Sequence, residues 1–209
     1  MTKHLNNKEH SILEAAQREF LEKGYDGART TSIARNAGVT HAMLHYYFKT
    51  KEQLFERIFK ETIGLMGKSL IGVFTGSDKP VLERIKDAIE FHFNFICENP
   101  QLPLFIIREV ASRPERFSLV KETISAVAGG LMKALQQDFD EAAKRGEIEE
   151  VEASTLMLDM LSLNAFPFLI QPLFQAAMGN KLGNVDKFYE TRKKENIEII
   201  MRRLTPRKS

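Results

Sequence analysis

Three residues near the N-terminus are spaced in a way that few local structures permit. Ala34 is followed by Gly38 four positions later and by Leu44 six positions beyond that. A small residue lets two short helices cross at a steep angle, and a glycine makes the sharp turn between them. An apolar residue on the second helix then closes the small core. The spacing predicts a helix–turn–helix.

Helical periodicity also dominates the rest of the chain, and no convincing run of alternating apolar and polar residues predicts a strand. Pro167 is expected to kink or break the helix in which it lies. The sequence therefore predicts an all-α fold. Its helices are expected at about 7–23, 31–37, 41–48, Lys51 to Phe59, a further stretch ending near Phe74, 80–98, 104–111, 114–145, 151–178 and 185–204.

The chain has 209 residues, which is enough for a small domain and a larger one with a core of its own. We expect an N-terminal three-helix domain over residues 1–50 and a larger helical domain over residues 51–209. The helix that begins at Lys51 is expected to connect the two domains.

The net charge of the chain is only +2, but the basic excess is N-terminal. Residues 1–60 hold ten Lys or Arg and seven Asp or Glu, a balance of +3, whereas the remaining residues have a balance of -1. No Asp or Glu occurs between Asp26 and Glu52, although charged residues make up 28% of the chain. A surface without carboxylates suits a polyanionic partner, because nothing on it repels phosphate.

The second helix of the predicted motif has two different faces. At about 100° per residue, Leu44, Tyr47 and Phe48 point toward the core and act as packing residues. The opposite face carries polar and aromatic groups that are available for DNA. Its residues are Ala42, Tyr46 and, nearer the edges, His41 and His45.

The run GARTTSIARNAGVTHAMLHYYFKTKEQLF resembles the N-terminal DNA-binding domain of the tetracycline-repressor (TetR) family of bacterial transcriptional regulators. The resemblance covers about residues 8–58, and the stretch 34–54 is its most specific part. It implies that the larger domain binds a ligand and dimerises, because the remaining predicted helices have the number and order expected of that domain.

The resemblance also implies which side chains contact the DNA backbone. Thr31 and Thr40 match positions whose hydroxyl or amide meets a phosphate. Tyr46 and Tyr47 match positions that reach the backbone, and Lys51 matches the phosphate-binding lysine at the start of the fourth helix. Physical chemistry agrees for Lys51, because a cation beside the amides of a helix N-terminus makes a good phosphate clamp.

His41 and Ala42 match the positions that most often touch base edges in the family. His45 departs from the family, which usually has tyrosine there; a histidine can still donate to phosphate, but it is shorter and its charge depends on pH. His41 and His45 also stand four residues apart, a spacing that could hold a metal ion between two imidazoles. No third ligand lies nearby in the sequence, so we expect no metal site.

The sequence argues against several other classes of protein. We find no nucleophile with its base, no metal cluster and no glycine-rich phosphate loop, so we expect neither an enzyme nor a cofactor. The polar N-terminus and the single cysteine, Cys97, favour the cytoplasm. The apolar stretch 156–174 contains Asp159, Asn164 and Gln171, so we expect a buried helix or a helix interface and no membrane association.

A ligand of the larger domain is expected to be at least partly apolar and to bind among helices between about residues 74 and 139. Phenylalanine and methionine line adaptable pockets well, and most of both lie beyond residue 60. The alternative for each such residue is ordinary core packing. The candidate lining residues are Phe91, Phe95, Phe105 and Met132.

These inferences predict a sequence-specific, homodimeric repressor that a small ligand releases from its operator. A single short helix contacts too few base pairs for genomic specificity, so two copies are needed, about 34 to 36 Å apart on successive major grooves. The last two helices are expected to form the dimer interface. Two alternatives remain: a small-molecule or lipid-binding helical protein or an undetected enzyme, and a DNA-binding regulator without an inducer.

Overall fold

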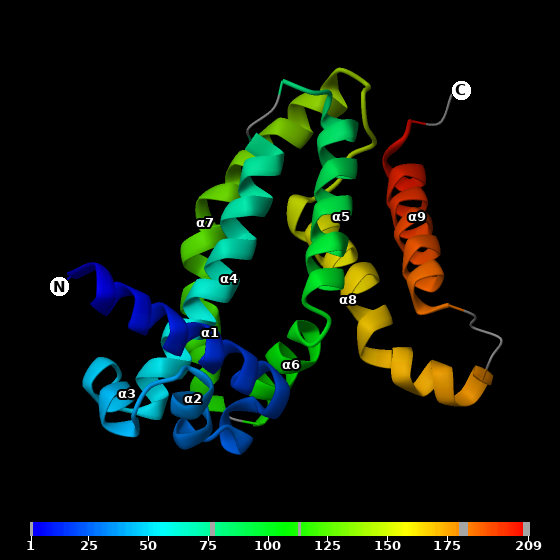
Figure 1. The fold of residues 1–209 in the computed structure, drawn as a ribbon. Helices are drawn as coiled ribbons and strands as arrows, with labels where there is room; N and C mark the ends of the chain where they lie inside the picture. The colour runs from blue at the N-terminus through cyan, green and yellow to red at the C-terminus, as the bar shows by residue number, and fades with distance from the viewer. Residues whose placement is uncertain (1, 76–77, 113, 180–183, 207–209) are drawn as a thin grey trace. The chain divides into compact units, whose positions relative to one another are not determined.

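The computed structural model describes residues 2–75, 78–112, 114–179 and 184–206. These residues contain helices and no strand, which confirms the all-α prediction (Figure 1). The helices are α1 (Thr2–Gly27), α2 (Thr30–Asn36), α3 (His41–Tyr47), α4 (Lys51–Thr75), α5 (Val81–Glu98), α6 (Leu102–Ser112), α7 (Pro114–Lys144), α8 (Ala153–Met178) and α9 (Val185–Leu204).

The chain divides into two compact units. Unit 1 comprises Met1–Leu65 and Leu104–Thr123, and unit 2 comprises Met66–Pro103 and Ile124–Ser209. This division differs from the expected boundary between residues 50 and 51. The start of α4 belongs to unit 1 because its apolar side chains pack in the same core as those of α1, and most of α6 joins that core as well.

The core of unit 1 is rich in aromatic rings. Phe20 of α1 lies edge-on to Phe55 of α4, with ring centroids 5.2 Å apart. Phe105 of α6 packs against Phe55 and Phe59 at centroid distances of 5.9 and 6.2 Å. Phe105 was a candidate for the ligand pocket of the larger domain, but it is 2% exposed and belongs to this core. Its position follows from the packing of α6, which the sequence pattern did not predict.

Two predicted helices differ from the observed ones. The expected helices from Lys51 to Phe59 and up to Phe74 are one helix, α4, because no proline interrupts the apolar pattern. Pro167 and Pro172 both lie inside α8. Figure 1 shows that α8 changes direction between its yellow and orange parts, as expected of a helix that contains proline.

The core of unit 2 is formed by apolar faces of α4, α5, α7, α8 and α9. Its most buried members include Ile85, Ala88 and Ile89 of α5, and Ile200 and Leu204 of α9. Helices α5, α8 and α9 contact one another in pairs, and Figure 1 shows them side by side. The last helix is therefore part of the core of this unit.

Helix α8 is long and apolar enough to cross a membrane by length and composition alone. One third of its most apolar window is buried inside the protein. Leu156, Met160 and Phe168 are buried, whereas Leu158, Phe166 and Leu173 on the same helix are 57 to 69% exposed. Helix α8 thus has one face in the core of unit 2 and a second apolar face on the surface.

Candidate nucleic-acid interface

The turn between α2 and α3 has the geometry that its spacing predicts. Gly38 adopts φ of +65°, a left-handed conformation that a side chain would disfavour. The amide of Val39 donates to the carbonyl of Ala34 at 3.0 Å, which closes the end of α2. Ala34 and Leu44 are 3% and 1% exposed, so the small residue and the apolar residue are both buried as expected.

Helix α3 has seven residues and is fixed at both ends. The Thr40 hydroxyl oxygen accepts a hydrogen bond from the amide of Met43 at 3.2 Å, which makes Thr40 the N-cap. Its O–H group can still donate to a phosphate. Leu44 and Phe48 are buried and Tyr47 is half-buried, which matches the predicted inner face.

The predicted outer face of α3 is exposed to solvent. His41, Ala42 and His45 are exposed, and Tyr46 is the most open of the aromatic residues on this face, at 69%. The rings of His41 and His45 lie edge-to-face with centroids 4.4 Å apart. The part of the chain that the structure describes contains no cluster of three or more His, Cys, Asp or Glu residues suited to a metal ion.

Hydrogen bonds orient both imidazole rings. Nε2 of His41 lies 3.0 Å from the hydroxyl of Thr30, the first residue of α2. Nδ1 of His45 lies 3.3 Å from the carbonyl oxygen of Lys49, so the ring nitrogen is the donor there. A neutral His45 in this tautomer presents Nε2 as an acceptor, which suits a phosphate poorly.

The start of α4 carries a cation three residues after Phe48, the C-cap of α3. Thr50 accepts a hydrogen bond from the amide of Gln53 at 3.1 Å and so caps α4. The ammonium group of Lys51 lies 4.4 Å from the centroid of the Tyr25 ring, within the range of a cation–π interaction. Lys51 is half-buried, and its side chain is therefore oriented by the protein.

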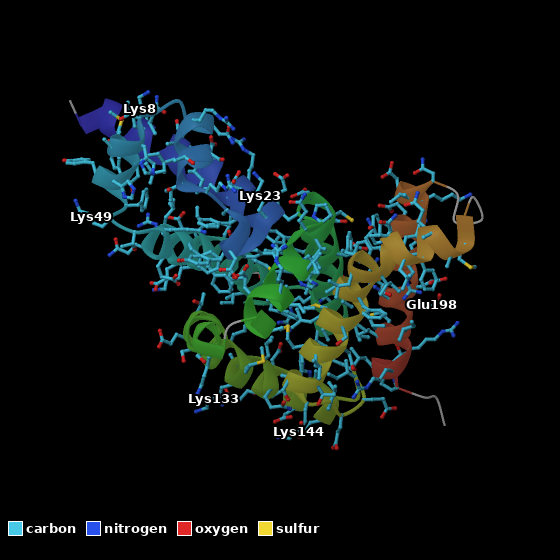
Figure 2. The ribbon with its side chains drawn as sticks, turned by 90° about the horizontal axis from the view of Figure 1, so that it is seen from below. Lys8, Lys23, Lys49, Lys133, Lys144 and Glu198 are labelled. Atoms are coloured by element: carbon cyan, nitrogen blue, oxygen red, sulfur yellow. The ribbon has the colours of Figure 1, made fainter. Side chains whose placement is uncertain are left out.

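Further positive charge surrounds these groups. Arg29, Arg35 and Thr31 are exposed on or next to α2. Lys49 is exposed between α3 and α4, with its ammonium group 5.7 Å from the Tyr46 ring centroid. Figure 2 labels Lys49 at the edge of the molecule. The carboxylate-free stretch therefore combines exposed cations and exposed aromatic rings, as a phosphate-binding surface requires.

Known proteins share the sequence pattern of the residues that form this surface. A profile described as "Bacterial regulatory proteins, tetR family" matches residues 12–58, from α1 into α4. Residues 12–58 form a tetR-family domain. The chain is a DNA-binding transcriptional regulator.

Similar proteins support this assignment along most of the chain. The chain is 27% identical to the Bacillus subtilis "Fatty acid metabolism regulator protein" over 143 residues, which cover 66% of this chain and 70% of that protein. It is 24% identical over 178 residues to the Staphylococcus aureus "Biofilm operon icaADBC HTH-type negative transcriptional regulator IcaR", covering 84% of this chain and 88% of that one. Both relatives are regulators by name, in agreement with the expectation that the chain is not an enzyme.

A solved structure shows the same fold. The hemolysin II transcriptional regulator HlyIIR superposes with a TM-score of 0.65 at 22% identity, and the match covers 97% of this chain and 99% of that one. The fold shared with that structure therefore extends through both units.

Three residues at or beside this surface were not among the predicted DNA-binding residues. Thr30 contacts His41, Lys49 adds a cation, and Tyr25 lies beside Lys51. Lys49 lies in the acid-free stretch, so its charge could have indicated it. Thr30 is uncharged, and only its contact with His41 reveals it. Tyr25 precedes that stretch, and only the tertiary fold brings it to the start of α4.

Proposed function

We propose that this tetR-family protein is a homodimeric repressor that binds a specific DNA operator through α3 and leaves it when a small apolar ligand binds. The observation that carries the proposal is the outer face of α3, which is exposed, acid-free and bordered by Lys51. In a helix–turn–helix protein the second helix enters the major groove. The cytoplasm, where such a regulator meets its DNA, is the proposed location.

Each candidate residue has a proposed role that its environment supports. His41 and Ala42, at the first turn of α3, contact base edges, because N-terminal residues of a recognition helix reach the bases. Thr31, Thr40 and Lys51 contact phosphates from the starts of three helices. Tyr46 and Tyr47 reach the sugar–phosphate backbone, and His45 contacts it less well than the tyrosine usual at that position.

The exposed apolar face of α8 supports the proposed dimer. A groove of about 330 Å³ between α8 and α9 is lined mainly by apolar groups, including Phe166, Phe174 and Phe188. Large exposed apolar patches on soluble proteins mark interaction sites. Two copies packed through this face would bury it in a four-helix bundle. Its large exposed residues are Leu158, Leu161, Phe166, Leu173, Phe174 and Met178.

An apolar ligand suits the interior of unit 2. A pocket in its core has a volume of only about 10 Å³, about the space that one water needs. A larger ligand that binds at this pocket must therefore open the core. Phe91 and Met132 are half-buried against the same core, and the Phe95 ring lies 6.4 Å from that of Phe91, but none of the three lines the cavity. The lining residues are Phe74, Ile85, Ile89, Leu135, Phe139, Ala153, Leu156, Met157, Met160 and Ile200.

The names of two relatives support repression as the mode of regulation and a fatty acyl chain as the ligand. The Staphylococcus relative is a negative regulator by name, which supports repression. The Bacillus relative is a regulator of fatty acid metabolism by name, and a fatty acyl chain is a ligand that an apolar core can accept. Fatty acids and their thioesters of increasing length are therefore the probes to test first, with DNA release and melting temperature as the measurements. If none of these probes releases DNA or raises the melting temperature, the result favours a DNA-binding regulator without an inducer.

The central experiment selects operator DNA from a random pool and then changes α3. We expect His41→Ala and Ala42→Ser to alter base preference at single positions of each half-site, by about 1 to 3 kcal/mol. Lys60→Ala, an exposed change further along α4, serves as the control and leaves base preference unchanged. Equal weakening of every half-site variant by His41→Ala would show that another element reads the bases.

A further inference from the structure

The backbone of α1 bends sharply just before its end. Gly24 has φ of 67° and ψ of -179°, which interrupts the helical geometry. Its position is also crowded, because a Cβ atom added there would lie 2.7 Å from Cζ of Arg108 on α6. Any side chain at residue 24 would therefore be strained by the backbone and would displace the guanidinium group.

A buried carboxylate on α6 holds the next residue. The amide of Tyr25 donates a hydrogen bond to Oε1 of Glu109 at 2.9 Å. Glu109 is only 5% exposed, and Nε of Arg108 lies 3.9 Å from the same oxygen. A carboxylate acceptor in a buried position makes a strong hydrogen bond, so this contact fixes the course of the chain after the bend.

The side chain of Tyr25 transmits this constraint to the proposed DNA-binding surface. Its ring packs edge-on against Phe55, with centroids 5.3 Å apart, and lies parallel to the ring of Phe20 at 6.3 Å. The ammonium group of Lys51 lies 4.4 Å from the centroid of the same ring. A cation over an aromatic ring is attracted by its electron-rich face, so the ring limits where Lys51 can point.

We propose that Glu109 is a positioning residue for DNA binding. By holding the Tyr25 amide, Glu109 keeps the Tyr25 ring beside Lys51, and this ring orients the ammonium group toward a DNA phosphate. The three residues come from α6, α1 and α4, all within unit 1. The inference rests on the proposed contact between Lys51 and phosphate, and it adds two residues that touch no DNA themselves.

The salt dependence of DNA binding tests the inference directly. Each phosphate contact contributes about one unit to the slope of log K against log salt concentration. We expect Lys51→Ala, Tyr25→Leu and Glu109→Ala each to lower this slope by about one unit per bound protomer, measured by fluorescence anisotropy on a labelled mixed-sequence duplex. A residue that only stabilises the fold would lower the active fraction of protein without changing the slope.

Conservative variants provide matched controls. Tyr25→Phe keeps the aromatic ring and Glu109→Gln keeps an oxygen that can accept the Tyr25 amide, so both are expected to retain the wild-type slope. The effect of Tyr25→Leu is expected to disappear in a Lys51→Ala background. If Glu109→Ala does not fold, the comparison of Tyr25→Leu with Tyr25→Phe still decides the outcome.

The results separate this inference from the proposed function. A normal slope for Lys51→Ala would overturn both, because Lys51 would then contact no phosphate. A reduced slope for Lys51→Ala together with a normal slope for Tyr25→Leu would overturn only the inference. Full additivity of Tyr25→Leu and Lys51→Ala would overturn it as well, since the two residues would then act independently.

Discussion

At the scale of single residues, His45 shows how a hydrogen bond within the protein limits a side chain. Its Nδ1–H group is used by the carbonyl oxygen of Lys49. A phosphate needs a donor, and a neutral ring in this tautomer offers only an acceptor at Nε2. The tyrosine usual at this position in the family would instead present a hydroxyl group.

We expect His45→Tyr to bind operator DNA about 2- to 10-fold more tightly at pH 8, where a histidine is ordinarily neutral, because one hydrogen bond is worth about 0.5 to 1.5 kcal/mol. His45→Phe supplies a similar ring without the hydroxyl group and serves as the control. Anisotropy titrations of the three proteins make the comparison. Equal gains for tyrosine and phenylalanine would point to stacking rather than to a hydrogen bond.

A second histidine is buried instead of exposed. His92 of α5 is 3% exposed, and burial lowers its pKa from 6.5 to about 4 because the charged form is poorly solvated. In the unfolded chain the ring accepts a proton as pH falls below about 6.5. The folded protein resists protonation until about pH 4, so falling pH favours the unfolded state across this window.

We therefore expect the free energy of unfolding to decrease by up to about 3 kcal/mol between pH 7 and pH 4 on account of His92 alone. In His92→Gln this part of the decrease is expected to vanish, as measured by urea unfolding at several pH values. His10→Gln, on the exposed surface of α1, is the control for the loss of a histidine outside the core. If His92→Gln and the wild type showed the same pH dependence of the unfolding free energy, His92 would not be its source.

At the scale of helices, α5, α8 and α9 are joined by a buried polar network. Nδ2 of Asn164 on α8 donates to the carbonyl oxygen of Ile89 at 3.0 Å and lies 3.2 Å from Nδ1 of His92. Its Oδ1 accepts from Nδ2 of Asn196 on α9 at 3.0 Å. Asn164 and Asn196 are fully buried, so each bond replaces a contact with water.

Asn164→Ala removes the centre of this network and leaves buried polar partners unsatisfied. We expect a loss of about 1 to 3 kcal/mol of stability, measured by chemical denaturation. Gln175→Ala, an exposed change on the same helix, is expected to alter stability by less than about 0.5 kcal/mol. A neutral Asn164→Ala would show that water can replace the amide and that the network adds little to the packing of the three helices.

At the scale of the whole molecule, the proposed dimer determines how DNA is bound. Removing residues 184–209 is a poor test of the interface, because Ile200 and Leu204 of α9 belong to the core of unit 2. A truncated chain would lose stability whether or not α9 met a partner. A charge on the exposed face of α8 changes the interface without touching that core.

Leu173 is 69% exposed on α8, and we expect Leu173→Glu to give a folded monomer with a melting temperature close to that of an isolated wild-type subunit. Two like charges in an apolar interface are strongly unfavourable. Light scattering reports the mass, and operator titration is expected to show at least about 100-fold weaker binding, because the two half-sites are then bound independently. Leu104→Glu, at a 57% exposed leucine of unit 1, is the control that keeps the dimer.

The sequence by itself determined the local structures. The spacing of Ala34, Gly38 and Leu44 predicted the turn and both its helices, because glycine conformation and side-chain size act over a few residues. The exposed face of α3 followed from helical periodicity. The lack of carboxylates between Asp26 and Glu52 indicated the chemistry of the partner before any fold was known.

Only the tertiary structure decided which distant segments meet. Phe105 looked like a pocket residue because a buried phenylalanine has the same sequence pattern in a core and around a ligand, and packing against Phe55 and Phe59 placed it in unit 1. The contact of Glu109 with Tyr25 spans 84 positions of the chain. Such contacts depend on how helices pack, and helical periodicity specifies which face is buried but not which partner covers it.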